Sequence, residues 1–512
     1  MCCTILYTVL ILFVSLIFIP ICLLRWRTCA YARRRFEPLL AQQRHPTARE
    51  QQGDARRPLK VVFLHPDLGI GGAERLVVDA AVALQKHQRI TPVHVLIVTN
   101  HHDSRRAFTE TVDGTVAVEV YGSWLPTSVM GRAKVFTATI RMCWAALVTC
   151  YAHPQTDCFM VDQVAAILPL LRLLAPYTPR LFYCHFPDQC CDGNRDENRK
   201  YKTTPSVWRL FYRRLFDEVE ALAMNHATSI VSNSRFSRAV TVSVFPTLAS
   251  RIDAEFDIFY PPVSLAVAQG AHGAGDATQF TGEELEPLRR VLVDRSVVLS
   301  INRYERKKNL ALAIEAFALV MSSGRLTCAK KPLLVFAGGY DTRLEENVAH
   351  LEELQHIAEQ HHIGGDNIFF LKNISEVEKR YLLSQCCCLL YTPTSEHFGI
   401  VPTEAMINAK PVIAVNRGGP CESVGEGGVL CDPTPEAFAD AMLMYLNDDK
   451  LRERAGEAGR KRASEVFTID IFGEKLATRF VDIWTAANSM LDAEGVVRSR
   501  TTEEGTRRER MD

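Results

Sequence analysis

Two glutamates eight positions apart, Glu396 and Glu404, bracket the segment 396–404 (EHFGIVPTE). The apolar run before it, 388–392, predicts a buried strand. Pro402 is expected at the first position of the following helix, which puts Glu404 in the first helical turn. Open parallel sheets bind ligands at such corners, beyond the carboxyl ends of their strands. A carboxylate pair there can hold a polyhydroxylated ligand by accepting hydrogen bonds from its hydroxyl groups.

A second candidate site is the cationic segment 300–309 (SINRYERKKN), which lies between a predicted strand and a predicted helix. A run of charges is more often a solvated face. Here the run follows the first strand of a predicted doubly wound sheet, where a diphosphate is expected to bind. We therefore expect at least Arg303 and Lys308 to make charge-assisted bonds to phosphate.

A glycine pair follows the first strand of the chain's body. Gly71 and Gly72 precede a helix predicted over 73–87, and they allow a phosphate or a sugar hydroxyl to approach the positive helix end closely. The alternative is that they only form a tight turn. A dinucleotide fingerprint would need glycine at Glu74, which weakens a nicotinamide interpretation, although Asp103 after the second strand keeps it open.

His185 ends a predicted strand, 181–186, in the segment YCHFPD. A lone histidine is more often a structural residue whose hydrogen bonds are satisfied. Its position at the carboxyl end of the strand makes an active-site role an equal alternative.

Composition bounds the class of protein. The chain has 512 residues, of which 47% are hydrophobic, so it can form two domains with appendages. Lysine plus arginine and aspartate plus glutamate both count 59, so net charge gives no reason to expect a nucleic-acid partner. The 16 cysteines lack zinc-site spacing and are interpreted as reduced thiols, and no metal site is predicted.

The N-terminus carries a candidate membrane anchor. Residues 4–24 contain no charged side chain, and a membrane helix needs about 20 apolar residues. A cleaved signal peptide is the alternative, because 30–32 (AYA) resembles a cleavage site. Five arginines lie between residues 25 and 35 and no cation precedes the apolar stretch, so the positive-inside rule predicts a cytosolic body and a lumenal N-terminus.

Apolar strands alternate with helical stretches along the body, which predicts two doubly wound parallel sheets. The first fold has candidate strands at 61–65, 93–99, 159–162, 181–186 and 229–232. The second fold has candidate strands at 297–301, 333–337, 368–371, 388–392, 412–415 and 428–431. The apolar segment 135–152 either forms a buried helix or dips into a bilayer surface.

The domain boundaries follow from this pattern. They are an anchor and tether at 1–57, with the anchor helix at about 4–24; a first Rossmann-like domain at 58–265, onto which a helix at 471–490 packs back; a flexible loop at 266–292; a second Rossmann-like domain at 293–470; and a disordered tail at 491–512.

Four segments carry a family resemblance: 65–76, 182–188, 300–310 and 396–402. They resemble the dolichol-linked alpha-1,3/1,6-mannosyltransferases of asparagine-linked glycosylation, which belong to the retaining glycosyltransferases of family 4. The mark of family 4 is Glu-x7-Glu, and the resemblance runs from about residue 60 to 487. It implies the GT-B fold, in which two Rossmann-like domains face each other across a cleft.

The resemblance also implies substrates and a place in the cell. The donor would be GDP-mannose and the acceptor mannosyl-chitobiose-diphosphate-dolichol, extended first by an alpha-1,3 and then by an alpha-1,6 mannose. Transfer would occur on the cytosolic face of the endoplasmic reticulum membrane, without a required cofactor or metal. Other mannosyltransferases of the pathway are further candidate partners.

Residue roles are implied only where the motifs match. Glu404 would bind the ribose of GDP and Glu396 the transferred mannose. Arg303 and Lys308 would bind the diphosphate and stabilise the charge that develops as GDP leaves, and His185 would lie beside the mannose. The remaining predicted donor-binding residues are Gly71, Gly72, Phe398, Gly399, Ile400 and Val401; the glycine pair would hold donor phosphate or let the acceptor approach.

Three other functions stay open on the sequence. The chain could be another family 4 transferase with a different donor, a catalytically silent membrane scaffold, or a nicotinamide-dependent dehydrogenase. A test of donor specificity separates another family 4 transferase from the mannosyltransferase. Loss of the five polar site residues would mark a silent scaffold, but the chain keeps all of them: Glu396, Glu404, Arg303, Lys308 and His185. Binding of NAD in place of GDP would mark a dehydrogenase.

Overall fold

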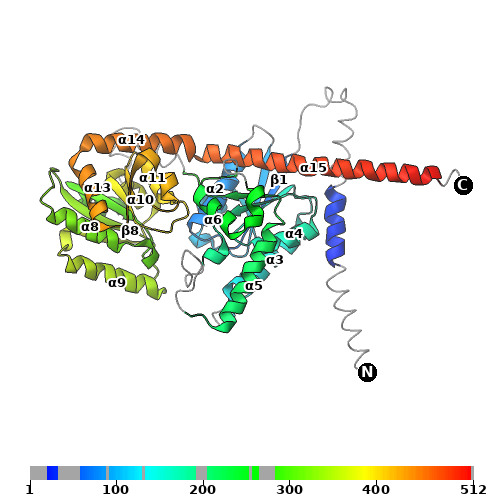
Figure 1. Ribbon diagram of the computed structural model, residues 1–512, viewed down its shortest axis with the longest axis horizontal. Helices are drawn as coiled ribbons and strands as arrows, with labels where there is room; N and C mark the ends of the chain where they lie inside the picture. Colours follow the sequence, from blue (N-terminus) through cyan, green and yellow to red (C-terminus); the bar gives the residue numbers. More distant parts are fainter. Residues whose placement is uncertain are drawn as a thin grey trace. The chain divides into compact units, whose positions relative to one another are not determined.

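Two buried parallel sheets organise the chain, as Figure 1 shows for this computed structural model. The structure describes residues 20–32, 58–87, 92–129, 133–191, 204–252, 257–263 and 283–508. Contacts divide the chain into two units. The first comprises residues 1–232, 238–259 and 473–512, and the second comprises 233–237 and 260–472.

The first unit is built on a six-stranded sheet in the order β3-β2-β1-β4-β5-β6, with every neighbouring pair parallel. Its strands are β1 (Leu59–His65), β2 (Val93–Thr99), β3 (Ala117–Val120), β4 (Cys158–Asp162), β5 (Arg180–Cys184) and β6 (Ser229–Ser232). The predicted strands are confirmed except that β3 was missed. This edge strand has four residues and none of them is buried, so it lacks the apolar run that marks the others.

Helices cover both faces of the first sheet. They are α2 (Gly72–Lys86), α3 (Lys134–Ala152), α4 (Leu168–Leu174), α5 (Val207–Met224), α6 (Arg235–Val244) and the first-unit part of α15 (Ile469–Arg508). One face packs against α3 and α4, while α2 and α15 lie on the other, where the rings of Phe63 and Phe480 are 6.4 Å apart. Gly473 permits the close approach of α15 to α2, because a Cβ there would lie 2.9 Å from Ala83.

The second unit repeats the pattern in the order β12-β11-β10-β7-β8-β9, again wholly parallel. Its strands are β7 (Arg295–Ile301), β8 (Lys331–Gly338), β9 (Ile368–Lys372), β10 (Cys386–Tyr391), β11 (Val412–Val415) and β12 (Gly428–Cys431), and all six correspond to predicted strands. Its helices are α7 (Glu286–Leu292), α8 (Ala311–Ser322), α9 (Glu345–Gln360), α10 (Glu376–Gln385), α11 (Ile400–Ile407), α12 (Pro420–Ser423), α13 (Pro435–Asn447) and α14 (Asp449–Val466).

Both sheets share one connectivity, in which the first strand lies between the second and the fourth. Successive crossover connections therefore run toward opposite edges of the sheet on either side of one point. That point lies between β1 and β4 in the first unit and between β7 and β10 in the second. Ligands bind beyond the carboxyl ends of the strands at such switch points. The predicted α/β doubly wound fold class is confirmed, and each unit presents one switch point.

Several boundaries differ from prediction. Residues 283–292 of the predicted flexible loop 266–292 contain α7, whose Leu288 and Leu292 are buried, and the rest of that loop up to 282 lies outside the described residues. Helix α15 continues to Arg508, across most of the tail predicted to be disordered at 491–512. That stretch contains no proline and is rich in helix-forming glutamate and arginine.

The predicted anchor falls almost wholly outside the described residues, since only its end, within a helix over 20–32, is included. Among the described helices, α3 alone is long and apolar enough to cross a membrane. Its buried side includes Met142, Ala145 and Cys150, which pack in the core of the first unit. Residues 135–152 therefore form a helix that is buried along one side.

Candidate functional site

A lysine and a glutamate meet at the switch point of the second unit. Strand β7 leads to a single 3-10 turn, Arg306–Lys308, and β10 leads to the loop 392–399. The Nζ of Lys308 donates to Oε2 of Glu396 at 2.6 Å. The hydroxyl of Thr392 fixes the backbone, because it donates to the carbonyl oxygen of Lys308 at 2.7 Å. The structure thus brings together two of the predicted site residues.

The surroundings of Glu396 keep it ionised. Burial raises the pKa of this carboxyl, but the Lys308 ammonium is the main opposing influence, and the net effect of the surroundings holds the pKa below its ordinary value. His397 and a hydrogen bond with Tyr391 act in the same direction. The side chains of Lys308 and Glu396 remain 15% and 21% exposed, so solvent and ligands can reach the pair.

Two glycines position the Glu396 loop by close backbone contact. A Cβ at Gly418, where φ is +68°, would lie 2.6 Å from the carbonyl oxygen of Glu396. A Cβ at Gly419 would lie 2.3 Å from the Cα of Phe398. The N–H of Gly419 donates to the carbonyl oxygen of Glu396 at 2.8 Å. These glycines are required for packing of the site loop.

The start of α11 differs from prediction. The helix begins at Ile400, so Pro402 is its third residue and Glu404 its fifth, beyond the first turn. Gly399 precedes the helix with φ of +83°, a conformation that glycine adopts without strain, and this lets the helix begin two residues before the proline. The expected position of Pro402 was therefore wrong, whereas the strand-to-helix corner itself is confirmed.

Glu404 has a cationic partner that sequence reasoning missed. The Nζ of Lys379, on α10, donates to Oε1 of Glu404 at 2.9 Å and lies 3.0 Å from Oε2 of Glu376. Burial would lower the pKa of the Lys379 ammonium, but the two carboxylates outweigh burial and raise it. Lys379 lies 25 positions from Glu404, and no local pattern links the two elements.

The other predicted site residues of the second unit lie outside the Lys308–Glu396 pair. Arg303 lies 2.8 Å from Glu305 and is 62% exposed, so its guanidinium is open to a ligand. Phe398 is buried, and its ring stacks on Tyr260 at 5.6 Å, so only its backbone remains for a ligand contact. Gly399 is buried as well, and Ile400 and Val401 are half-buried.

Three residues meet at the switch point of the first unit. His65 ends β1, Asp162 ends β4 and His185 follows β5, which are three adjacent strands. The Nδ1 of His65 lies 2.8 Å from both carboxylate oxygens of Asp162, and the Nε2 of His185 lies 3.2 Å from Oδ2. One carboxylate therefore orients two imidazoles, of which only that of His185 is partly exposed, at 21%.

The charges in this cluster are strongly coupled. Burial would raise the pKa of Asp162, but His65 and His185 outweigh it and lower that pKa to about 2. Burial would lower the pKa of His65, but Asp162 and Glu74 outweigh it, so the pKa is raised. His65 is fully buried and its Nε2 has no hydrogen-bond partner; the nearest carboxylate oxygen, of Glu74, is 3.9 Å away.

Sequence reasoning named His185 but missed Asp162 and assigned His65 no role. The positions of Asp162 and His65 in the sequence could have revealed them, because both are polar residues that end apolar strands of one parallel sheet. Carboxyl ends of adjacent parallel strands lie at one edge, so such residues are candidates to meet.

Gly71 and Gly72 differ in the space that a side chain would find at each position. A Cβ at Gly71 would lie 2.2 Å from Oε2 of Glu74, whose side chain covers the start of α2, whereas a Cβ at Gly72 would meet nothing within 4 Å. The carboxylate of Glu74 places negative charge at this helix end. That charge favours a hydroxylated ligand over a phosphate.

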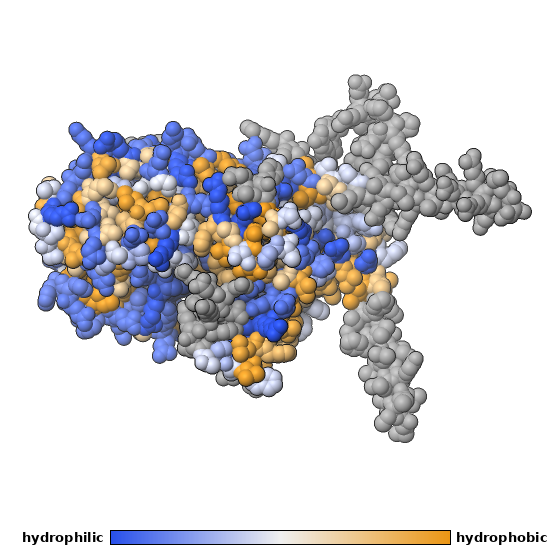
Figure 2. All heavy atoms as spheres, in the orientation of Figure 1, coloured by the Kyte–Doolittle hydropathy of each residue, from blue (hydrophilic) through white to orange (hydrophobic). Residues whose placement is uncertain are grey.

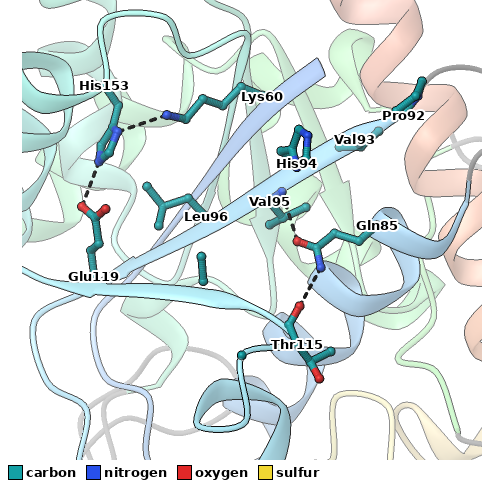
Figure 3. Close-up of a pocket in the computed structure, with 12 residues that line it drawn as sticks. Lys60, Gln85, Pro92, Val93, His94, Val95, Leu96, Thr115, Glu119 and His153 are labelled. Atoms are coloured by element: carbon teal, nitrogen blue, oxygen red, sulfur yellow. Dashed lines mark hydrogen bonds and ion pairs between the residues drawn. The ribbon is translucent and has the colours of Figure 1, made fainter. Parts of the chain in front are cut away.

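A cavity of about 610 Å³ in the first unit lies away from this cluster. Figure 3 shows that its polar wall links Lys60, His153 and Glu119, with Lys60 Nζ 3.1 Å from His153 Nδ1 and Glu119 Oε2 2.8 Å from His153 Nε2. Lys60, Val93 and Ala117 stand at or next to the amino-terminal starts of β1, β2 and β3. The cavity is therefore at the opposite end of the sheet from His65 and Asp162.

Within the described parts of the chain, no group of three or more His, Cys, Asp or Glu side chains is arranged to hold a metal ion.

Comparisons with known proteins identify the family and the fold. Residues 288–462, most of the second unit, match the family model described as glycosyl transferases group 1. The alpha-1,3/1,6-mannosyltransferase ALG2 of Homo sapiens is 40% identical over 439 residues, which cover 83% of this chain and 97% of that protein. The ALG2 protein of Dictyostelium discoideum is 37% identical over 436 residues, which cover 82% of this chain and 98% of that protein.

Solved structures share the fold at low identity. A sucrose-phosphate synthase from Thermosynechococcus elongatus has a TM-score of 0.65 at 17% identity and covers 84% of this chain and all of that one. The Anabaena protein HepE, solved with UDP and glucose, has a TM-score of 0.58 at 18% identity and covers 83% of this chain and all of that one. These likenesses identify the GT-B glycosyltransferase fold. The chain belongs to the ALG2 family of alpha-1,3/1,6-mannosyltransferases.

Proposed function

We propose that this chain transfers mannose from GDP-mannose to mannosyl-chitobiose-diphosphate-dolichol, first in alpha-1,3 and then in alpha-1,6 linkage, during synthesis of the lipid-linked oligosaccharide for protein N-glycosylation. The observation that carries the proposal is the Lys308–Glu396 pair at 2.6 Å on the second switch point. It combines a cation suited to phosphate with a carboxylate suited to sugar hydroxyls. The full-length ALG2 relatives support the linkage assignments.

Donor activation is assigned to the second unit. The carboxylate of Glu396 accepts hydrogen bonds from the hydroxyl groups of the mannose. The Lys308 ammonium and the exposed Arg303 guanidinium bind the diphosphate. As the bond from the sugar C1 to the phosphate oxygen breaks, these cations stabilise the charge that develops on GDP. Phe398, Gly399, Ile400 and Val401 contribute mainly backbone to the same donor site.

Retention of configuration follows from attack on the face that GDP leaves. The acceptor hydroxyl oxygen forms the new bond to C1, and its proton passes to the departing phosphate oxygen. The anomeric carbon keeps its configuration, and no protein base is required.

Glu404 is assigned to the ribose of GDP. Lys379 holds this carboxylate from one side at 2.9 Å, which limits the orientations from which it can accept ribose hydroxyls. A carboxylate oriented before binding loses less entropy when the nucleotide arrives.

The first unit is assigned the sugar and acceptor contacts. Asp162 orients His185 by accepting from its Nε2–H, which leaves Nδ1 for a sugar hydroxyl. This tautomer is assigned on the contact with Asp162. The open space at Gly72 suits an approaching acceptor hydroxyl, and the Glu74 carboxylate makes the donor phosphate the weaker candidate there.

Transfer is proposed to need no metal, since the charges of Lys308 and Arg303 can stabilise the leaving diphosphate. Activity should then survive a chelator such as EDTA, measured as mannose transferred per minute. Complete loss that added Mg²⁺ or Mn²⁺ restores would contradict this assignment.

The site of action is proposed to be the cytosolic face of the endoplasmic reticulum membrane. The uncharged stretch 4–24 and the arginines that follow it support an anchor with a cytosolic body. A dolichol-linked acceptor is held in a bilayer, so such an anchor would bring enzyme and acceptor to one surface. Other mannosyltransferases of the pathway are proposed as neighbours there.

The test is incubation of the full-length, membrane-inserted protein with GDP-mannose and a phytanyl or dolichyl diphosphate-linked mannosyl-chitobiose. Product masses and linkages should show two added mannoses, alpha-1,3 before alpha-1,6. The Glu396→Gln variant should lose transfer, while Glu426→Gln, a change at an exposed glutamate, should retain it.

Each other outcome identifies a different function. Transfer from another nucleotide sugar alone would indicate a different family 4 enzyme. Correctly folded protein with no transfer from any donor would indicate a silent scaffold, and NAD binding in place of GDP would revive the dehydrogenase interpretation.

A further inference from the structure

A half-buried glutamate on α5, Glu220, is not used by the site described above. Its two carboxylate oxygens accept backbone N–H groups from the 3-10 turn Asp188–Cys190. Oε1 accepts from Asp188 at 2.6 Å, and Oε2 accepts from Gln189 at 3.2 Å. These two N–H groups are the first of the turn, where a helical turn offers no acceptor of its own. Glu220 therefore fixes the start of the turn to α5.

A second side chain of α5 holds the same turn. Arg213 lies seven positions before Glu220, about two helical turns, so both side chains are on one side of the helix. The Nη2 of Arg213 donates to the carbonyl oxygen of Asp188 at 3.2 Å. The opposite side of α5 is exposed at Trp208 and Phe211, and Figure 2 shows hydrophobic residues gathered at the lower edge of the view, where α5 lies. The inner side of α5 is thus the side that holds the turn.

The turn is joined to His185 by a stiff stretch of backbone. His185 follows the last residue of β5, and only Phe186 and Pro187 separate it from Asp188. Proline restricts its own φ, here −59°, and restricts the residue before it to extended conformations. The backbone is held on one side of His185 by the sheet and on the other side by Glu220. A shift of the turn is therefore passed on to His185.

The charge of Glu220 is unfavourable for folding. Burial raises the pKa of its carboxyl to about 7, and the carboxylates of Asp188 and Asp217 act in the same direction, against the two N–H bonds. The pKa in the folded chain is above the ordinary value of 4.5, so the free energy of unfolding falls as pH rises from 4.5 through about 7. Stability therefore gives no reason for an ionisable acceptor at this position.

Other titratable groups lie around Glu220 in the part of the chain that the structure describes. Burial raises the pKa of two neighbouring thiols, those of Cys184 on β5 and Cys191 after the turn, to about 12, so both stay neutral at pH 7. The Arg213 guanidinium, 3.4 Å from Asp217, stays charged. Neither the thiols nor the guanidinium changes charge near pH 7, whereas Glu220 does.

We propose that Glu220 is a positioning residue for His185. Its ionised carboxylate holds the Asp188–Cys190 turn by charge-assisted bonds, which are about twice as strong as neutral ones, and the turn fixes the imidazole beside the transferred sugar. Protonation of Glu220 weakens this hold, so transfer becomes sensitive to pH near 7. This positioning role rests on the proposed function, in which His185 contacts the mannose.

Amide hydrogen exchange of the full-length protein tests the contact without substrate. In Glu220→Gln the side-chain NH2 faces one of the two backbone N–H groups, so the protection of the Asp188 and Gln189 amides should fall about tenfold. Glu218→Gln is the matched control, because Glu218 is an exposed glutamate of the same helix. Its protection should equal that of the wild type. Equal protection in Glu220→Gln and wild type would overturn the proposal.

The wild-type protein alone gives a second reading of the contact. After correction for intrinsic exchange rates, the protection of the Asp188 and Gln189 amides should fall as pH is lowered from about 8 to about 6, because Glu220 becomes protonated. This measurement decides the proposal even if Glu220→Gln does not fold. Protection that is constant across this range would overturn it.

A kinetic test compares Glu220→Gln with the wild type. At about pH 8 the variant should have a kcat for mannose transfer about tenfold lower and a nearly unchanged KM for GDP-mannose, because a misplaced His185 affects the reacting sugar. The ratio of wild-type to variant kcat should fall toward one as pH is lowered to about 6. This ratio removes the titration of groups that both enzymes share. A ratio that does not change with pH would overturn the proposal.

The His185→Ala background shows whether Glu220 acts through His185. In that background Glu220→Gln should lower kcat no further. A second loss of about tenfold would show that Glu220 acts on another part of the site, and it would overturn the proposal.

Thermal unfolding separates positioning from folding. The melting temperature of Glu220→Gln at about pH 8 should not fall, because the unfavourable buried charge is removed. A drop of several degrees together with the loss of kcat would assign Glu220 to folding and overturn the proposal. If the wild type transferred no mannose, the proposed function would fail, whereas the exchange measurements would still show whether Glu220 holds the turn.

Discussion

The Lys308 ammonium lies 2.6 Å from Glu396 although the two residues are 88 positions apart in the chain. They meet because β7 and β10 are neighbours at the point where the second sheet reverses its direction of connection. Two adjacent parallel strands thus deliver a cation and an anion to one place from separate loops. This pairing keeps Glu396 ionised and leaves both side chains partly accessible to a ligand.

The pair predicts a shift in pH dependence. In Lys308→Met the burial of Glu396 remains while its main counter-charge is lost, so the pKa of Glu396 should rise. If transfer needs the ionised carboxylate, the acidic limb of kcat/KM should move to higher pH, and kcat/KM at neutral pH should fall about 100-fold. The measurement is the pH profile of mannose transfer.

Lys307→Met is the matched control, because Lys307 is 66% exposed and pairs with Glu305. Its acidic limb should coincide with that of the wild type. An unshifted limb in Lys308→Met would show that the lysine does not control the ionisation of Glu396.

The His65–Asp162 pair predicts a pH-dependent contribution to stability. Asp162 has a lowered pKa, so its contribution is present above its ordinary pKa of 3.8 and is lost as pH falls toward about 2. His65 has a raised pKa, so its contribution is complete below its ordinary value of 6.5 and is lost as pH rises through the raised value. Asp162→Asn should therefore destabilise most between about pH 4 and 6.5, by about 3 kcal/mol.

Thermal unfolding of wild type and Asp162→Asn across this pH range provides the measurement. Asp67→Asn breaks a surface pair, in which Asp67 and His101 are 61% and 56% exposed, and should have little effect. A destabilisation by Asp162→Asn that is constant from pH 4 to 9 would argue against a charged pair.

The Lys379 contact predicts an effect on donor affinity. Lys379→Met removes the cation that lies between the carboxylates of Glu404 and Glu376. Because Glu404 is then no longer held in place, the KM for GDP-mannose should rise about tenfold while kcat changes less. Lys379→Arg should recover part of the affinity. Lys372→Met is the control, because that ammonium lies over the ring of Tyr340 at 4.4 Å on an exposed site. Loss of kcat with constant KM would contradict the orientation of Glu404 by Lys379.

Two glycines should respond oppositely to alanine. At Gly72 a Cβ has open space, so Gly72→Ala should keep the melting temperature and raise the KM for the acceptor. At Gly419 a Cβ would lie 2.3 Å from the Cα of Phe398, so Gly419→Ala should lower the melting temperature by several degrees. Wild-type kinetics in Gly72→Ala would show that this glycine only forms a turn.

Much of the fold could be predicted because buried parallel strands are nearly continuous apolar runs, as in β4 and β10. The edge strand β3 lacks such a run and was missed. The start of α11 was misplaced because the positive φ of Gly399 decides it, and the proline rule does not include that conformation.

Site residues could be predicted where a residue of suitable chemistry follows directly after an apolar strand. Lys308 and Glu396 each follow an apolar strand and were named. Asp162 is the last residue of its strand, and its two partners come from neighbouring strands, so only the strand order reveals the cluster. Lys379, on α10, reaches Glu404, on α11, across 25 positions of the chain, which no local spacing encodes.

A double-mutant cycle on Lys308 and Glu396 tests the central claim most directly. The measured quantity is kcat/KM for mannose transfer from GDP-mannose by wild type, Lys308→Ala, Glu396→Ala and the double variant. If the pair acts as one unit at the switch point, each single substitution should lower kcat/KM about 100-fold. The double variant should then have a kcat/KM little below that of the more impaired single variant. Losses that multiply, or a single variant with wild-type activity, would contradict the account.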